Sequence, residues 1–252
     1  MFTLLRTHSV SMTVSMFMLG IAFTVIVCGL AQLLRNPPLN PVADTSPASA
    51  GLKPVAVGST PGEILRTRRF YLLWVIYFIG AGAGLMVIGS VSGMAKKSMG
   101  EAAYIAVAVM AIGNACGRIG AGLLSDKIGR RWTLMLVLLF QAVLMFVAIP
   151  VTGAKDLAPA IIVLVASLIG FNYGANLSLF PSFTKDLWGL KSFGMNYGVL
   201  FTAWGMGGLV LPRLQQMLTA RSGSYQSSFI TAAVLLLIGS ALTLLIRPQP
   251  KK

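Results

Sequence analysis

The most diagnostic stretch of this chain reads Gly122-Leu123-Leu124-Ser125-Asp126-Lys127-Ile128-Gly129-Arg130-Arg131-Trp132-Thr133-Leu134. It forms a short basic turn between two apolar runs, each long enough to cross a hydrocarbon core of about 30 Å. Charges gathered in a short turn between such runs are typical of a loop that joins two membrane helices. The stretch therefore predicts an integral membrane protein and a lipid bilayer as its surroundings.

The composition of the chain supports this class. Of its 252 residues 56% are apolar and 10% charged, whereas about 25% are charged in an average soluble domain. The net charge of +14 comes from cations in short loops, which excludes the basic, aromatic-interleaved surface of a nucleic-acid binder. Cys28 and Cys116 lie in different apolar runs and His8 is the single histidine, so we expect no disulfide framework, metal site or cofactor.

The apolar runs predict an all-α integral membrane fold with seven transmembrane helices. We place them at residues 10–34, 70–95, 102–124, 132–152, 158–181, 195–218 and 227–247. Residues 1–34 thus form one membrane helix, residues 35–69 a Pro-rich and largely disordered loop, and residues 70–252 a six-helix unit. Thr60-Pro61-Gly62-Glu63 has the pattern of a capping box, and we expect it to start the helix that enters the second span.

The distribution of cations predicts the orientation of the spans. With the basic turn at residues 127–131 in the cytoplasm, alternation places thirteen of the twenty Lys and Arg residues inside and six outside, with Arg118 within a span. The N-terminus is then outside and the C-terminus cytoplasmic. We expect the protein in the cell membrane, which in a bacterium is the inner membrane.

The basic turn also carries a family resemblance. Its pattern G-x-L-x-D-[RK]-x-G-[RK]-[RK]-x-x-L resembles the signature loop of the major facilitator superfamily, a large group of secondary transporters with twelve helices in two halves. The resemblance implies that the chain corresponds to helix 6, the central loop and the C-terminal six-helix half. It also implies a gating role for the loop residues, which are Gly122, Asp126, Lys127, Gly129, Arg130 and Arg131.

Two further segments resemble one branch of that superfamily. The stretches 170–182 (GFNYGANLSLFPS) and 196–205 (NYGVLFTAWG) are similar to helices 10 and 11 of the oxalate/formate antiporter family. The turn 186–191 and the segment 35–38 fit the same family, to which the monocarboxylate transporters are related. The resemblance implies a secondary active transporter of small organic anions such as formate, lactate, pyruvate or oxalate, working as an antiporter or symporter by alternating access.

Arg118 is the sharpest candidate for a substrate-binding residue. It is the single charged residue well inside a predicted span, where ionisable residues are usually functional, although snorkelling toward the interface is the structural alternative. The resemblance implies that its guanidinium holds the substrate carboxylate. Asn114 lies one helical turn earlier on the same face, where the resemblance implies a titratable aspartate, and Asn cannot carry a proton.

The helices after Arg118 supply further candidates. Trp204 stands where the resemblance implies a second cation, a lysine, so a monoanion suits the site better than the dianion oxalate; the alternative is simple helix packing. Asn172, Tyr173 and Asn176 are candidates to line the pore, and interhelical hydrogen bonding is the alternative for them.

The sequence gives less support to other classes of function. A membrane-embedded enzyme would need a cluster of acids, histidines or metal ligands, and the predicted spans contain none. A half transporter offers one wall of a substrate site. The chain is therefore expected either to assemble with a separately encoded N-terminal half or to be a transport-incompetent fragment.

Overall fold

The computed structural model describes residues 12–33, 58–153 and 159–246, and all regular structure in these ranges is helical. The chain divides into two units, residues 1–55 and 56–252. In the first unit the described residues form one helix, α2 (Met12–Ala31), in agreement with the predicted first span. Its side chains are almost all exposed, as expected of a helix made to contact lipid or other membrane helices. Most of the predicted loop, residues 34–57, lies outside the described ranges.

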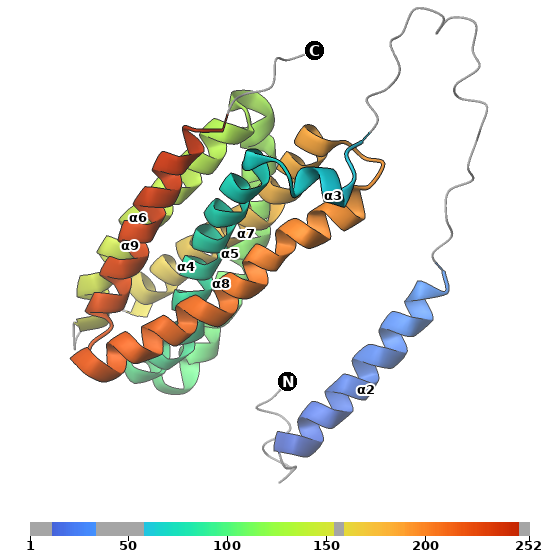
Figure 1. Ribbon diagram of the computed structural model, residues 1–252. Helices are drawn as coiled ribbons and strands as arrows, with labels where there is room; N and C mark the ends of the chain where they lie inside the picture. The colour runs from blue at the N-terminus through green and yellow to red at the C-terminus, as the bar shows by residue number, and fades with distance from the viewer. Residues whose placement is uncertain (1–11, 34–57, 154–158, 247–252) are drawn as a thin grey trace, which may run out of the picture. The chain divides into compact units, whose positions relative to one another are not determined.

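The second unit is a helical bundle (Figure 1). Its elements are α3 (Pro61–Ile64), α4 (Arg68–Met99), the 3-10 turn η3 (Gly100–Ala102), α5 (Ala103–Ile128), α6 (Arg130–Gly153), α7 (Pro159–Trp188), α8 (Phe193–Ser222) and α9 (Gln226–Thr243). Six helices of the described chain are long and apolar enough to cross a membrane, namely α2, α4, α5, α6, α7 and α9.

Helix α8 is the element where the prediction of seven spans is not fully met. The predicted span 195–218 is helical throughout, but it is not among the six candidates. Glycines, Asn196 and Arg213 interrupt its apolar residues and lower its mean hydropathy. A helix of this composition is typical of one that turns part of its surface to other helices or to water.

The diagnostic stretch 122–134 is not a turn along its whole length, which corrects the prediction. Residues up to Ile128 belong to α5 and residues from Arg130 belong to α6. Gly129 alone breaks the helix, with φ of 92°, a conformation that a side chain would strain. Its N–H donates to the Ser125 carbonyl at 3.0 Å, and its own carbonyl accepts from the Thr133 N–H at 3.2 Å. A one-residue break keeps the basic side chains on rigid helix ends.

The capping box starts a helix, as predicted, but the prediction that this helix continues into the second span is wrong. The Thr60 N–H donates to Glu63 Oε2 at 2.9 Å and a helix begins at Pro61. This helix, α3, ends after one turn, and α4 starts separately at Arg68, where the Thr67 hydroxyl accepts from the Phe70 N–H at 3.4 Å. The end of the predicted loop is therefore an ordered corner.

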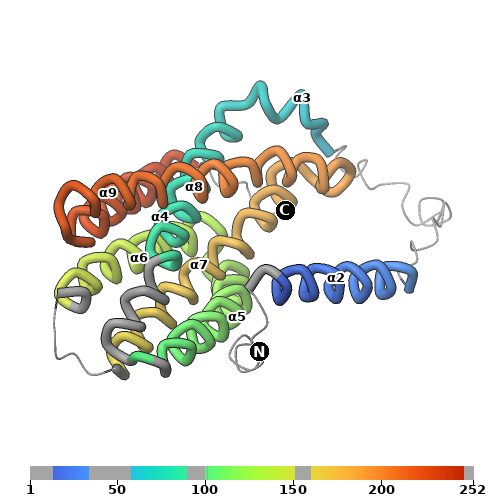
Figure 2. Tube along the Cα trace, turned by 90° about the horizontal axis from the view of Figure 1, so that it is seen from below, coloured from blue at the N-terminus to red at the C-terminus, as the bar shows by residue number. Residues whose placement is uncertain are grey.

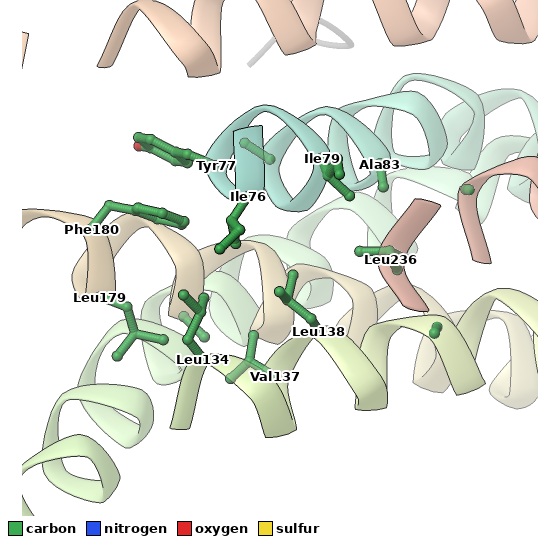
Figure 3. Packing of buried hydrophobic residues seen from close by; sticks show 14 of the residues in the cluster. Ile76, Tyr77, Ile79, Ala83, Leu134, Val137, Leu138, Leu179, Phe180 and Leu236 are labelled. Atoms are coloured by element: carbon green, nitrogen blue, oxygen red, sulfur yellow. The ribbon is translucent and has the colours of Figure 1, made fainter. Parts of the chain in front are cut away.

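The core of the bundle lies between α4, α6, α7 and α9. Ile76 of α4, Leu134 and Leu138 of α6, Leu179 of α7 and Leu236 of α9 are fully buried and converge there (Figure 3). Helix α4 supplies the centre, because 61% of its candidate membrane span is buried, whereas only 17% of the α5 span is buried. Helix α5 therefore keeps most of its surface free of contacts within the described bundle.

Candidate functional site

Helices α5 and α7 touch through their backbones, and glycine makes this possible. A Cβ atom at Gly117 of α5 would collide with the Phe171 carbonyl oxygen of α7, and one at Gly174 of α7 would collide with the Asn114 carbonyl oxygen of α5. Small residues allow such close approach between membrane helices. The two helices lie side by side in the tube view (Figure 2). This contact fixes the register of Asn114 and Arg118 against the part of α7 that carries Tyr173.

The side chains of Asn114 and Arg118 are paired on the open face of α5. Arg118 Nε donates to Asn114 Oδ1 at 3.2 Å. Arg118 is exposed and makes no ion pair with any residue that the structure describes. Asn114 thus orients the guanidinium through one of its five N–H groups and leaves the terminal NH2 groups available.

Five aromatic residues of α4, α7 and α8 form a cluster, which we call the aromatic wall: Tyr77, Tyr173, Tyr197, Phe201 and Trp204. Tyr77 and Tyr173 are buried, and the other three are half-buried. Trp204 Nε1 donates to the Tyr173 hydroxyl at 2.8 Å, and the Trp204 ring stacks on Phe201 with centroids 5.0 Å apart. The hydroxyls of Tyr77 and Tyr197 are 3.4 Å apart. The Tyr77 ring also stacks on the Phe180 ring, with centroids 3.8 Å apart, and this contact connects the wall to the core (Figure 3).

The positive charge of Arg118 interacts electrostatically with the wall. Its influence reaches the hydroxyls of Tyr77, Tyr173 and Tyr197, which belong to three different helices. Among the predicted site residues, hydrogen bonds join Asn114 to Arg118 and Tyr173 to Trp204, and the charge of Arg118 acts through space on Tyr173. An unpaired guanidinium beside phenol and indole groups can bind an anion whose remainder is apolar.

The predicted residues Asn172 and Asn176 lie elsewhere. Both are fully buried in the bundle, and their Nδ2 groups donate at 3.0 Å to carbonyls of their own helix, those of Leu168 and Asn172. The Oδ1 atom of Asn176 faces Gly80 of α4. The two asparagines are therefore buried, but their hydrogen bonds lie within α7 and their Oδ1 atoms have no partner among the described residues, so the interhelical hydrogen bonding given as the alternative is not seen.

Two of the signature residues, Asp126 and Arg130, form an ionic cluster with Asp186 at the ends of three helices. Arg130 of α6 contacts Asp126 of α5 at 2.8 Å and Asp186 of α7 at 3.1 Å, and it also reaches the Ser125 hydroxyl. Arg131 instead lies over the Trp132 ring, 5.3 Å from its centroid. Gly122 and Lys127 enter none of these contacts; a Cβ at Gly122 would meet open space.

Sequence reasoning did not single out Tyr77 or Asp186 as site residues. Tyr77 lies in a continuous apolar run and has no motif around it. Asp186 carried a usable signal, because it is one of only six acidic residues in the chain and follows a membrane span. Within the described ranges no group of three or more His, Cys, Asp or Glu residues could hold a metal ion.

Comparison with known proteins identifies the family of the chain. The sequence profile described as Major Facilitator Superfamily matches residues 7–188 and 73–252. The chain is 29% identical to the uncharacterised MFS-type transporter YhjX of Escherichia coli over 193 residues, which cover 75% of the chain and 45% of that protein.

Two relatives have names that mention substrates. The chain is 29% identical over 192 residues to the oxalate:formate antiporter of Oxalobacter formigenes, covering 75% of the chain and 44% of the antiporter. It is 25% identical over 213 residues to mouse monocarboxylate transporter 11, covering 77% of the chain and 48% of the transporter. The chain thus spans about half the length of the curated relatives it matches.

Proposed function

The chain belongs to the major facilitator superfamily, and from this membership we propose that it forms helix 6 and the C-terminal half of a secondary transporter of small organic monoanions. In this proposal the carboxylate binds Arg118, and the half-buried members of the aromatic wall, Tyr197, Phe201 and Trp204, contact the rest of the anion. Alternating access then carries the anion across the membrane.

One observation carries the proposal. Arg118 makes no ion pair within the described residues, is oriented by Asn114, and acts electrostatically on three phenol hydroxyls. An unpaired charge inside a membrane span is costly, which makes it a functional site by default. A carboxylate would accept two parallel hydrogen bonds from the free edge of the guanidinium and neutralise it.

The charge of the site favours a monoanion as the substrate and the exchange of one anion for another as the mode of transport. Trp204 occupies the position of the expected second cation and uses its N–H for Tyr173, which leaves a single positive charge facing the substrate. The carboxylates of Glu63, Asp126 and Asp186 lie at helix ends, so none of these three is placed to carry a proton beside Arg118. The unloaded site stays positive, and returning it empty through the low-dielectric occluded state would cost more than returning it with an anion.

The ionic cluster is proposed to act as part of the cytoplasmic gate. Arg130 holds the ends of α5, α6 and α7 together through Asp126 and Asp186. Rocking of the two halves would form or break these ion pairs. This role needs the orientation inferred from the cations, with the cluster and the C-terminus in the cytoplasm. It also needs α8 to cross the membrane in addition to the six candidate spans.

A second reading is that the chain has no transport activity by itself. The relatives are about twice as long, and a substrate site of this fold lies between two halves. A separately supplied N-terminal half would then provide the second wall. Searching the DNA immediately upstream for five further spans separates a two-part transporter from a lone half.

Counterflow in proteoliposomes tests the proposal. The chain is reconstituted into vesicles, together with the N-terminal half if one is found. The vesicles are loaded with unlabelled formate, pyruvate, lactate or oxalate. The same anion is then added outside in labelled form. We expect labelled monoanions to accumulate only in loaded vesicles, and oxalate to accumulate less. Accumulation that does not depend on internal anion would refute exchange, and no accumulation by a complete transporter would refute the substrate class.

A further inference from the structure

The corner between α3 and α4 carries a cationic surface that the proposed transport site does not use. Arg66, Arg68 and Arg69 are exposed there, and none of them makes an ion pair with a residue in the described part of the chain. The candidate membrane span of α4 begins at Arg68. Arg68 and Arg69 are thus the first residues of this span, and Arg66 precedes it by two residues.

These cations stand at the unfavourable end of a helix. The N-terminus of a helix is equivalent to about half a positive charge, and the first turn of α4 contains no acidic residue. The nearest carboxylate in sequence, Glu63, is engaged by the Thr60 N–H. An external anion would relieve both the mutual repulsion of the arginines and the repulsion from the helix end.

The corner is rigid. The Ser59 N–H donates to the Trp188 carbonyl at 2.9 Å, and Asn196 Nδ2 donates to the Ser59 carbonyl at 2.8 Å. Ile64 and Phe70 are buried, and Phe70 packs on the Trp188 ring with centroids 6.2 Å apart. The arginine backbones are thus held in place before any ligand arrives, which lowers the entropic cost of binding.

Apolar groups flank the cations. Leu65 is 40% exposed and Tyr71 is 56% exposed, on either side of the three arginines in the sequence. Tyr is enriched at the membrane interface, where its ring meets acyl chains and its hydroxyl meets head groups. A soluble anion would leave these groups in water, whereas a lipid would cover them.

We propose that the arginine corner, defined as Leu65, Arg66, Arg68, Arg69 and Tyr71, binds the phosphate head group of an anionic phospholipid in the adjacent leaflet. The guanidinium groups hold the phosphate, and Leu65 and Tyr71 contact the start of the acyl chains. The proposal does not depend on the transport activity, because it uses none of the residues near Arg118.

Lipid binding to the purified chain in uncharged detergent tests this proposal. Phosphatidylglycerol and zwitterionic phosphatidylcholine are titrated, and bound lipid is counted by native mass spectrometry. Each cation near a membrane surface contributes about a fivefold gain in affinity for anionic lipid. We expect Arg68→Gln to weaken phosphatidylglycerol binding about fivefold, the triple variant at positions 66, 68 and 69 on the order of 100-fold, and phosphatidylcholine binding to stay unchanged.

Arg221→Gln is the matched control, because Arg221 is an exposed arginine in the last turn of α8, where a helix favours a cation. It should change binding less than twofold, and all variants should unfold at the parent temperature without lipid. The proposal is overturned if the triple variant binds phosphatidylglycerol like the parent, if Arg221→Gln loses as much as Arg68→Gln, or if equimolar inorganic phosphate displaces the lipid.

Discussion

Replacing Gly117 by Ala tests the backbone contact that registers α5 against α7. The new Cβ would overlap the Phe171 carbonyl oxygen and lie 2.7 Å from its carbonyl carbon. These are backbone atoms of a packed helix and cannot rotate away. Overpacking of this kind costs about 1–3 kcal/mol, and the higher helix propensity of Ala returns about 1 kcal/mol.

Gly122→Ala in the same helix is the control that separates the steric cost of the new Cβ from the gain in helix propensity. A Cβ at Gly122 meets nothing within 4 Å, so this variant gains the propensity term alone. The free energy of unfolding should therefore differ between the two variants by about 1–3 kcal/mol, with Gly117→Ala the less stable. Unfolding by sodium dodecyl sulfate in mixed micelles, followed by tryptophan fluorescence, measures this difference. Equal stabilities would refute the close contact and, with it, the argument that α7 fixes the position of Arg118.

Three other predictions concern the site and the gate. Asn114→Asp should abolish anion binding at neutral pH, because the new carboxylate pairs with Arg118, whereas Asn114→Ala should weaken binding only several-fold; equilibrium binding of labelled lactate distinguishes the two. Trp204→Lys should raise the preference for oxalate over formate in competition assays by about tenfold or more, since a second cation suits a dianion; an unchanged preference would remove Trp204 from the specificity argument. A double-mutant cycle of Arg130→Gln and Asp186→Asn should give a coupling energy of about 0.2–1 kcal/mol, the range for an exposed pair, and a coupling of zero would mean that the contact does not hold α6 to α7.

The sequence predicted the helices well because long apolar runs leave the backbone no other solution in a membrane. It predicted their ends less well. Helix α7 continues seven residues beyond the predicted end at 181, to Trp188, because polar residues at the membrane surface do not stop a helix. The capping box at Thr60 was read correctly as a helix start, but its pattern does not encode where that helix ends.

Site residues could be predicted from the sequence where the residue type is unusual for its position, and not where the type is common. A charged residue in an apolar run singled out Arg118, and helical spacing paired it with Asn114, as the 3.2 Å hydrogen bond confirms. Helical spacing could not decide which residue of α7 faces α8, so Asn172 and Tyr173 had equal standing. Both are buried, but only Tyr173 reaches Trp204. Tyr77 needed the fold itself, because its partner Tyr197 is 120 residues away.

Anion binding at Arg118 is the measurement that tests the central claim most directly. Equilibrium binding of labelled formate and lactate is compared for the parent protein, Arg118→Gln, Arg118→Lys and the control Cys116→Ser, an exposed neighbour on the same helix. We predict that Arg118→Gln loses binding by about 100-fold or more, corresponding to the roughly 3 kcal/mol of a charge-assisted hydrogen-bonded pair. Arg118→Lys should retain part of the binding, and Cys116→Ser all of it. Undiminished binding by a folded Arg118→Gln variant would contradict the account.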